Sequence, residues 1–402
     1  MFTIVKFEMF TFVDQIKHME KEDLQLLFET HKESTLSHRY ITNKNIVPLF
    51  SKIKSIAEVK TIGQSVLGDD IFSITIGSGS KKILMWSQMH GNESTTTKAI
   101  FDFLNTCLAK ASIANNILER CTICIIPILN PDGAKKYTRV NANAVDLNRD
   151  AQNKTQPESR VLRAVFDSFK PDFCFNLHGQ RTIFSAGKAN KTATVSFLAP
   201  AQDKDCSITP TRKVAMEIIA EMNAYLQNII PNQVGVYDDA FNINCVGDTF
   251  QSENIPTILF EAGHFANDYA RDITRKFIYT SYLTSLTYIS NNSFEGDKHQ
   301  AYFSIPENEK MFYDVIIINA LLDENTKQST DIAFQFEERL ENSQIQFIPV
   351  LAKIGDLSNY YAHKQIDAKG GLVSTDDSKK LEMGYENVCV KLNNEKIVLF
   401  TK

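Results

Sequence analysis

The sequence reads Ile83-Leu84-Met85-Trp86-Ser87-Gln88-Met89-His90-Gly91-Asn92-Glu93 at the point that decides its fold. Four consecutive apolar residues predict a buried strand, and a helical pattern opens near Glu93. An imidazole and a carboxylate three residues apart, on the turn that leaves a strand, can bind one metal ion together. Zinc accepts nitrogen and oxygen ligands and keeps a coordination position open when the protein supplies only three.

Strand and helix patterns alternate on both sides of this stretch. Apolar runs predict strands at 70–77, 121–129, 173–177 and 255–260. Amphipathic spacing predicts helices at 100–108, from Pro157 to 169, at 211–226 and at 269–289. Alternating strands and helices are typical of an α/β layered fold with a largely parallel central sheet.

The two ends of the chain differ from this pattern. Residues 1–44 are predicted to form a helical lead-in whose apolar stripe consists of Leu24, Leu26, Leu27 and Phe28. After a linker candidate at 290–298, five strands are predicted at 312–320, 332–336, 345–350, 388–392 and 396–400. We therefore predict a main domain at 45–296 and a small β-rich accessory domain at 297–402. The strand pattern alone does not indicate whether this accessory domain shields a cleft, mediates assembly or binds a partner.

Composition narrows the class of protein. The 402 residues are 43% hydrophobic and 23% charged, which is ordinary for a globular protein. A net charge of -5 argues against a nucleic-acid partner, and no apolar stretch is long enough to span a membrane. The segment 1–8 is not a convincing signal peptide, so we expect a cytoplasmic protein unless the N-terminus is truncated. Cys121 and Cys124 lie in a predicted strand, which favours buried reduced thiols over a redox or zinc pair.

Two more polar residues follow predicted strands. His178 comes directly after the run at 173–177, and Glu261 comes after the run at 256–260. Because sites in open α/β sheets form at the carboxyl ends of strands, we expect both to lie near His90 and Glu93. Alone, each has an ordinary explanation as a surface turn, a hydrogen-bonded loop histidine or a helix-capping glutamate. Together they predict a metal site at His90, Glu93 and His178, with Glu261 placed to take a proton from water and pass it to a leaving amine.

The loop at 137–150 concentrates arginine and asparagine. Arg139 and Arg149 could each bind a carboxylate through the two-pronged guanidinium, or stabilise an oxyanion that develops on a carbonyl. A solvated polar loop is the alternative reading of this segment.

The motifs together resemble the zinc carboxypeptidase (metallocarboxypeptidase) family over residues 45–290. The matching segments, in chain order, are His90-x-x-Glu93, Asn130-Pro131-Asp132-Gly133, Asp146-Leu147-Asn148-Arg149, His178 and the strand that ends in Glu261. The resemblance implies a mixed, largely parallel eight-stranded sheet flanked by helices, with one catalytic zinc. It also implies a role for each matching residue: His90, Glu93 and His178 as zinc ligands, Glu261 as general base and proton shuttle, Arg139 as the group that polarises the scissile carbonyl, and Asn148 and Arg149 as the pair that holds the substrate's terminal carboxylate.

The chain departs from the family pattern in places. Ala144 stands where the family often has glycine. Tyr237 is the nearest candidate for the tyrosine that covers the substrate in many members, although its surroundings match poorly. The segment 242–250 is expected to line the side-chain pocket, without an obvious single charge. His264 could tune Glu261 but is better explained as a structural loop histidine.

These observations predict a zinc metallopeptidase that hydrolyses a peptide or isopeptide amide next to a free carboxylate. A related zinc deacylase or amidase, acting on N-acyl amino acids or cell-wall peptides, is one alternative. A non-catalytic peptide-binding protein on the same scaffold is the other. The expected partner is a peptide or acyl-amino-acid substrate, and the sequence does not give the oligomeric state.

Overall fold

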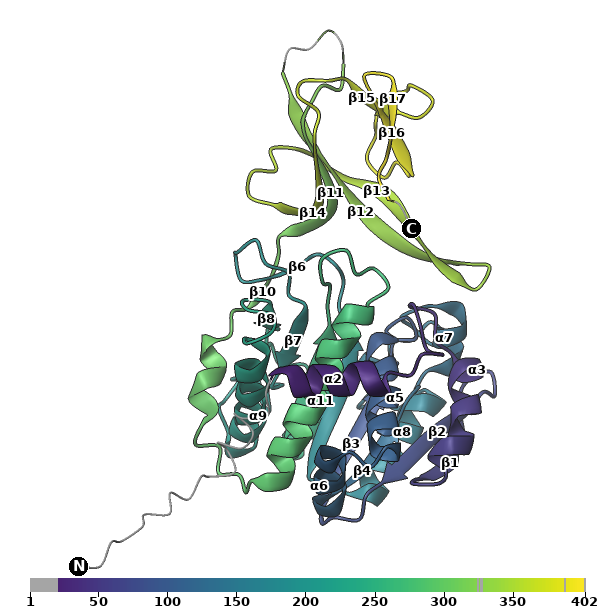
Figure 1. Ribbon diagram of the computed structural model, residues 1–402, viewed down its shortest axis with the longest axis vertical. Helices are drawn as coiled ribbons and strands as arrows, with labels where there is room; N and C mark the ends of the chain where they lie inside the picture. Colours follow the sequence, from purple (N-terminus) through teal and green to yellow (C-terminus); the bar gives the residue numbers. More distant parts are fainter. Residues whose placement is uncertain (1–20, 324, 326–327, 387, 401–402) are drawn as a thin grey trace, which may run out of the picture.

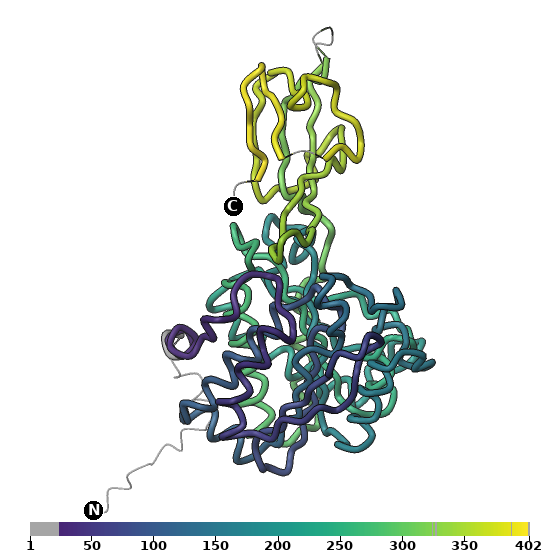
Figure 2. The backbone as a smooth tube through the Cα atoms, turned by 90° about the vertical axis from the view of Figure 1, so that its right-hand side faces the viewer, coloured from purple at the N-terminus to yellow at the C-terminus, as the bar shows by residue number. Residues whose placement is uncertain are grey.

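The computed structural model describes residues 21–323, 325, 328–386 and 388–400 (Figure 1). A larger α/β unit forms the body of the molecule, and two small C-terminal sheets stand at one end of it (Figure 2). The N-terminal segment 1–8 and most of the first half of the predicted helical lead-in lie outside the described residues.

The body is built on an eight-stranded sheet in the order β1-β2-β4-β3-β5-β9-β7-β8. Its four central strands run parallel: β4 (Cys121–Ile126), β3 (Lys81–Ser87), β5 (Phe173–Gly179) and β9 (Thr257–Ala262). The flanking strands are β1 (Glu58–Gln64) and β2 (Asp70–Ile76) on one side, and β7 (Val195–Leu198) and β8 (Val234–Val236) on the other. The pairs β1–β2, β2–β4 and β7–β9 are antiparallel. The predicted mixed, largely parallel α/β sheet is confirmed.

Side chains of the central strands alternate between two covered faces, which explains their continuous apolar runs. In β3, Ile83 and Met85 join the core on one face, and Leu84 and Trp86 join a second core on the other. The first face is covered by α5 (Thr95–Leu108), α6 (Ser112–Arg120), α9 (Pro210–Leu226) and α11 (Asp272–Asn291). The second is covered by α8 (Pro157–Phe169) and α10 (Val246–Ser252).

The described part of the lead-in packs on this body. In α2 (Lys21–His31), Leu24 and Phe28 are buried, as residues four apart on one helix face should be. Leu26 is 66% exposed, so the predicted stripe was wrong at that position, because a residue two places along a helix points elsewhere. The chain after α2 continues through α3 (Asn43–Ile46), η1 (Val47–Leu49) and α4 (Phe50–Ile53).

A fully buried ion pair fixes the end of the lead-in. Arg275 of α11 donates to both carboxylate oxygens of Asp102 in α5, and neither side chain is exposed to solvent. Arg275 also donates to the backbone carbonyls of Glu33 and Leu36. The pair therefore joins three segments that are far apart in the sequence.

The C-terminal sheets begin at Phe312. One has the order β13-β12-β11-β14, with β11 (Phe312–Ala320), β12 (Thr330–Glu341), β13 (Gln344–Gly355) and β14 (Tyr361–Asp367). The other consists of β15 (Val373–Thr375), β16 (Cys389–Leu392) and β17 (Glu395–Val398). The first residues of the predicted 297–402 domain pack on the body instead: η3 (His299–Ser304) contacts α9, and β10 (Asn308–Lys310) pairs with β6 (Phe184–Ala186).

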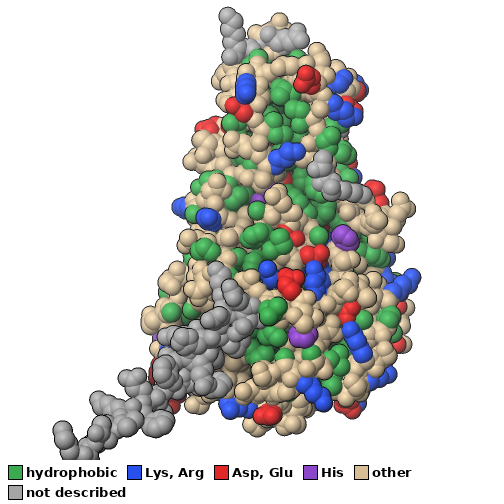
Figure 3. All heavy atoms as spheres, in the orientation of Figure 1, with side chains coloured by type: hydrophobic (Ala, Val, Ile, Leu, Met, Phe, Trp, Pro, Cys, Tyr) green, Lys and Arg blue, Asp and Glu red, His purple; other side chains and the backbone are tan. Residues whose placement is uncertain are grey.

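On the face shown in Figure 3, positive and negative side chains are intermingled. Within the described residues, the helices are too short or too polar to cross a lipid bilayer. Cys121 and Cys124 are buried in β4 outside any disulfide, and burial raises the pKa of both thiols to about 11, which matches the prediction of reduced thiols.

Candidate metal centre

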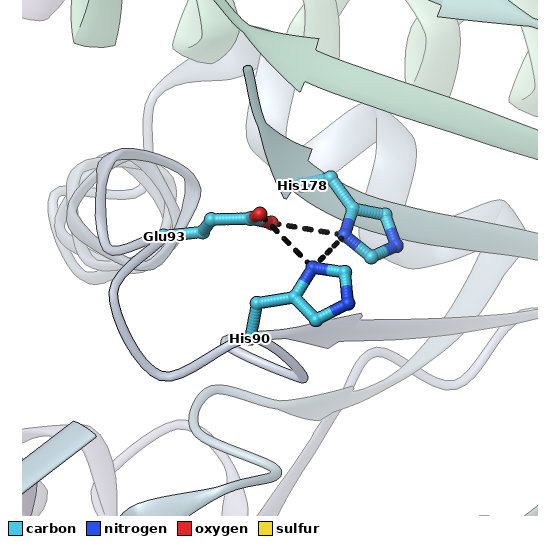
Figure 4. Close-up of side chains that lie close together, drawn as sticks. All are labelled: His90, Glu93 and His178. Carbon is cyan, nitrogen blue, oxygen red and sulfur yellow. Dashed lines mark hydrogen bonds and ion pairs between the residues drawn. The ribbon is translucent and has the colours of Figure 1, made fainter. Parts of the chain in front are cut away.

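His90, Glu93 and His178 lie together at the carboxyl ends of β3 and β5 (Figure 4). The Nδ1 atoms of the two histidines are 3.0 Å apart. The Glu93 carboxylate is 2.9 Å from His90 Nδ1 through one oxygen and 2.9 Å from His178 Nδ1 through the other. We refer to these three residues as the ligand cluster.

The turn that carries His90 requires glycine at position 91. An added Cβ on Gly91 would lie 2.0 Å from the backbone of Gly133, so the two backbones meet without side chains between them. Gly133 belongs to α7 (Pro131–Lys136), whose N-cap Asn130 accepts a hydrogen bond from the Gly133 amide at 2.9 Å. The Asn130-Pro131-Asp132-Gly133 segment therefore supports the turn from behind and contributes no ligand.

The hydrogen bonds of His90 leave Nδ1 ready to bind a cation. Its Nε2 lies 3.1 Å from Asp146 Oδ1, so this nitrogen carries the proton and Nδ1 keeps a lone pair directed at the cluster. A carboxylate behind a ligating histidine is the usual arrangement in metal sites. Two imidazole nitrogens and a carboxylate are a donor set that zinc accepts, and the ligand cluster fits this ion.

The electrostatics favour the ligand forms of Glu93 and His178. Burial opposes ionisation of Glu93, but the neighbouring histidines overcome it and hold the pKa of Glu93 well below its usual range. Burial lowers the pKa of His178, which keeps the ring neutral. Burial also opposes ionisation of Asp146, but its hydrogen bond to His90 and the charge of Arg139 outweigh burial and lower the pKa of Asp146.

Glu261 lies directly opposite His178 in the register of the parallel strands β5 and β9. Its Oε2 is buried and has no hydrogen-bond partner among the described residues. Burial, together with the negative charge of Glu93, raises the pKa of Glu261 well above its usual value. A carboxylate in this setting can accept a proton near neutral pH and release it again.

The two arginines of the 137–150 loop both line the site. Arg139 donates from Nε to Asp146 Oδ2 at 3.1 Å, and its Nη1 is 3.5 Å from Glu93 Oε1. Asn148 and Arg149 belong to η2 (Leu147–Arg149), which Asp146 caps. Asn148 Oδ1 accepts from the Val246 amide at 3.0 Å and so ties this turn to α10.

The region before Glu261 also reaches the site. The ring of Tyr237 packs edge-on against Phe184 with centroids 5.4 Å apart, and burial raises the pKa of its phenol, helped by the charges of Glu261 and Glu93. Segment 242–250 contributes Asp248 to the cavity lining, although the sequence did not single out this charge. Burial raises the pKa of Asp248 to about 6.

One cavity of about 810 Å³ joins these features. It is lined by all eight residues that the sequence singled out for the site: His90, Glu93, Arg139, Asn148, Arg149, His178, Tyr237 and Glu261. His264 is not in its lining. Its ring is buried between Tyr269 and His363, with centroids 4.7 and 4.3 Å away, as a structural histidine would be.

Sequence reasoning missed two sets of residues. Asp146 lies within one of the sequence motifs, but no role was predicted for it. A carboxylate that supports a ligating histidine has no fixed separation from it in the sequence. Sequence reasoning also missed the C-terminal residues Phe336, Glu338 and Phe347, which line the same cavity. They are more than 70 residues away from Glu261 in the sequence, so their position depends on how the two parts of the chain dock.

Fold and site together define an α/β protein of the metallopeptidase class, with a His/Glu/His cluster and, at the sheet edge, a glutamate with one buried carboxylate oxygen. The comparisons agree. The family model described as zinc carboxypeptidase matches residues 44–284, and the chain belongs to this family. Carboxypeptidase 2 of Trichophyton rubrum is 30% identical over 112 residues, which are 27% of this chain and 20% of the fungal protein.

Two solved structures share the fold. One is a Shewanella denitrificans protein provisionally named carboxypeptidase A, with a TM-score of 0.53 and 17% identity; the alignment covers 62% of this chain and 69% of that one. The other is a metallo-carboxypeptidase from Pseudomonas aeruginosa in complex with (2-guanidinoethylmercapto)succinic acid, with a TM-score of 0.50, 16% identity and the same coverage.

Proposed function

We propose that this protein is a zinc-dependent carboxypeptidase that hydrolyses a peptide or isopeptide amide next to a free carboxylate. The observation that carries the proposal is the shared cavity, in which the ligand cluster, Glu261 and two arginines meet. Family membership supports the same reaction class, because zinc carboxypeptidases act on peptides.

The ligand cluster would hold the zinc. Bound there, zinc supplies Lewis-acid chemistry, which makes water more acidic and a carbonyl more electrophilic. Asp146 fixes the orientation and tautomer of the His90 ring through Nε2. Glu93 is further held by the Gly179 amide, which donates to Oε2 at 3.0 Å.

Glu261 moves the proton. Its unpartnered Oε2 accepts a proton from the attacking water, and the raised pKa of this carboxyl keeps the proton until the amine leaves. The same oxygen then protonates the departing nitrogen, so the carboxylate returns to its starting state.

The arginines bind the substrate. Arg139 is half-exposed beside Glu93, so its guanidinium can meet the scissile carbonyl oxygen and stabilise the charge that develops on it. Arg149 is exposed to the cavity next to Asn148, and together they would hold the terminal carboxylate. Tyr237 lies on the wall near Glu261, where it would cover the bound substrate.

A digestion experiment tests the proposal. The protein is incubated with paired peptide libraries, one with free and one with amidated C-termini, with and without a zinc chelator, and the products are read by mass. We expect removal of C-terminal residues from free peptides only, and loss of this activity with chelator.

Other outcomes would assign a different function. Release of acyl groups from N-acyl amino acids, with the peptides left intact, would replace the proposal with the deacylase. Cleavage confined to cell-wall peptides would replace it with the amidase. Zinc binding and peptide binding without turnover would identify a non-catalytic binding protein.

A further inference from the structure

Part of the cavity wall comes from outside the α/β unit. Phe336, Glu338 and Phe347, which belong to the β12–β13 hairpin, line the same cavity as His178 and Glu261. In Figure 1 this hairpin extends from the C-terminal sheets over the part of the body that carries α7. A substrate held near the ligand cluster therefore shares its cavity with the accessory sheets.

The register of the hairpin directs these side chains the same way. Phe336 and Glu338 are two residues apart in β12, so they occupy one face of the strand. Phe347 is the cross-strand partner of Glu338 in β13, which puts it on that same face. The three side chains form a continuous surface towards the body.

Glu338 fastens this surface to the candidate active site. Its carboxylate accepts from Arg39 Nη2 at 2.9 and 2.8 Å and from the hydroxyl of Tyr137. The carbonyl of Arg39 accepts a hydrogen bond from Ser94, the residue after Glu93, and Tyr137 is two residues before Arg139. The hairpin is thus tied to the chain beside a proposed zinc ligand and beside the proposed carbonyl-binding arginine.

The surface is aromatic and only partly covered. The ring of Tyr269 is 5.3 Å from that of Phe336 and 5.1 Å from that of Phe347, and Phe400 is 5.2 Å from each phenylalanine. Phe336, Phe347 and Tyr269 all retain some exposure and all line the cavity. Partly exposed aromatic rings that border a cavity are suited to bind another apolar or aromatic group.

We propose that the aromatic face of the β12–β13 hairpin is a substrate-binding wall that selects an apolar, preferably aromatic, group on the acyl side of the scissile bond. The inference rests on the proposed function. Arg149 and Asn148, with α10 beside them, form the part of the lining assigned to the terminal carboxylate. The acyl side of the substrate then extends to the remaining lining, to which the hairpin belongs. The accessory sheets thereby determine substrate selectivity.

The test compares N-acetyl and N-benzoyl forms of one dipeptide, chosen from the library digestion and sharing the same scissile bond. Wild-type protein should prefer the benzoyl form in kcat/KM by about threefold to tenfold, the size expected for one aromatic contact. Phe347→Ala should abolish the preference by raising KM for the benzoyl form. Phe347→Leu, which keeps apolar bulk, should keep part of the preference.

Phe303→Ala is the matched control, because Phe303 is an exposed phenylalanine of η3 outside the cavity lining, and it should keep the full preference. A preference in Phe347→Ala equal to that of wild type overturns the inference and leaves the proposed function standing. If wild type hydrolyses neither compound, the proposed function fails. In that case, calorimetry on the zinc-loaded full chain measures the affinities for N-benzoyl and N-acetyl amino acids. The ratio of the two affinities in wild type and in the same variants then decides the inference.

Discussion

The two walls of the cavity are held in place by different means. The wall that carries the ligand cluster is fixed by the backbone, since β3, β5 and β9 are hydrogen-bonded neighbours and their register sets Glu261 opposite His178. The hairpin wall is held by side chains, through the contacts of Glu338 with Arg39 and Tyr137 and through the hydrogen bond that Gln335 donates to Thr182. The comparison teaches that the proposed catalytic groups are fixed by the sheet edge, whereas the proposed selectivity wall is attached to that edge through side-chain contacts.

The largest effect is expected at the ligand cluster. His178→Ala removes one of three donors, so the protein should no longer retain zinc after dialysis, and peptide hydrolysis should fall to background. Metal content is measured by mass spectrometry beside activity. His31→Ala, at the end of α2, is the matched control and should keep both. Full zinc retention in the His178 variant would contradict the assignment of His178 as a zinc ligand, and with it the role proposed for the wall that the sheet fixes.

Glu261→Gln separates metal binding from proton transfer. The amide keeps the shape of the side chain but cannot accept the proton, so zinc content should be normal while kcat falls by about a hundredfold to ten-thousandfold. Steady-state kinetics on a library-derived peptide checks this. Near-normal turnover would remove Glu261 from the base role.

Asp146→Asn tests whether the Asp146 carboxylate orients the His90 ring for zinc binding. The amide holds the His90 ring less well than a carboxylate, so zinc affinity should weaken by about tenfold to a hundredfold. Competition with a chromophoric chelator measures the affinity. An unchanged value would show that the backbone alone orients His90.

Arg149→Ala tests the binding of the terminal carboxylate. Loss of the guanidinium should raise KM for peptides with a free C-terminus by about tenfold, in line with the loss of a hydrogen bond to a charged group, and leave kcat little changed. Initial rates over a range of peptide concentrations separate the two constants. A fall in kcat with unchanged KM would place Arg149 in the chemical step instead.

The hairpin wall is tested through stability and not through activity. Glu338→Ala leaves Arg39 and Tyr137 without their shared acceptor and should lower the free energy of unfolding by about 1–3 kcal/mol. The neighbouring Glu337, whose side chain is 56% exposed, forms a surface ion pair with Arg339, and Glu337→Ala should cost less than about 1 kcal/mol. Chemical denaturation of both variants makes the comparison. Equal losses would mean that Glu338 does not fasten the hairpin.

Local patterns predicted much of the larger unit. The apolar runs of β3, β4, β5 and β9 are continuous because these strands are buried on both faces, and such runs are visible without a structure. Less regular elements were missed. The strand β14 contains His363, Lys364 and Gln365 in a row, and it joins the sheet only because β11 offers it a parallel edge.

By itself, the sequence determined the α/β class, the family and eight of the polar residues that line the cavity, because strand ends and short motifs are local features that carry their residue types with them. Tertiary structure alone decided that Asp146 backs His90, that Glu338 meets Arg39, and that a hairpin from the C-terminal sheets shares the cavity. Each of these contacts joins residues at least 56 positions apart. No local spacing encodes such a contact, since it depends on how separately folded layers dock.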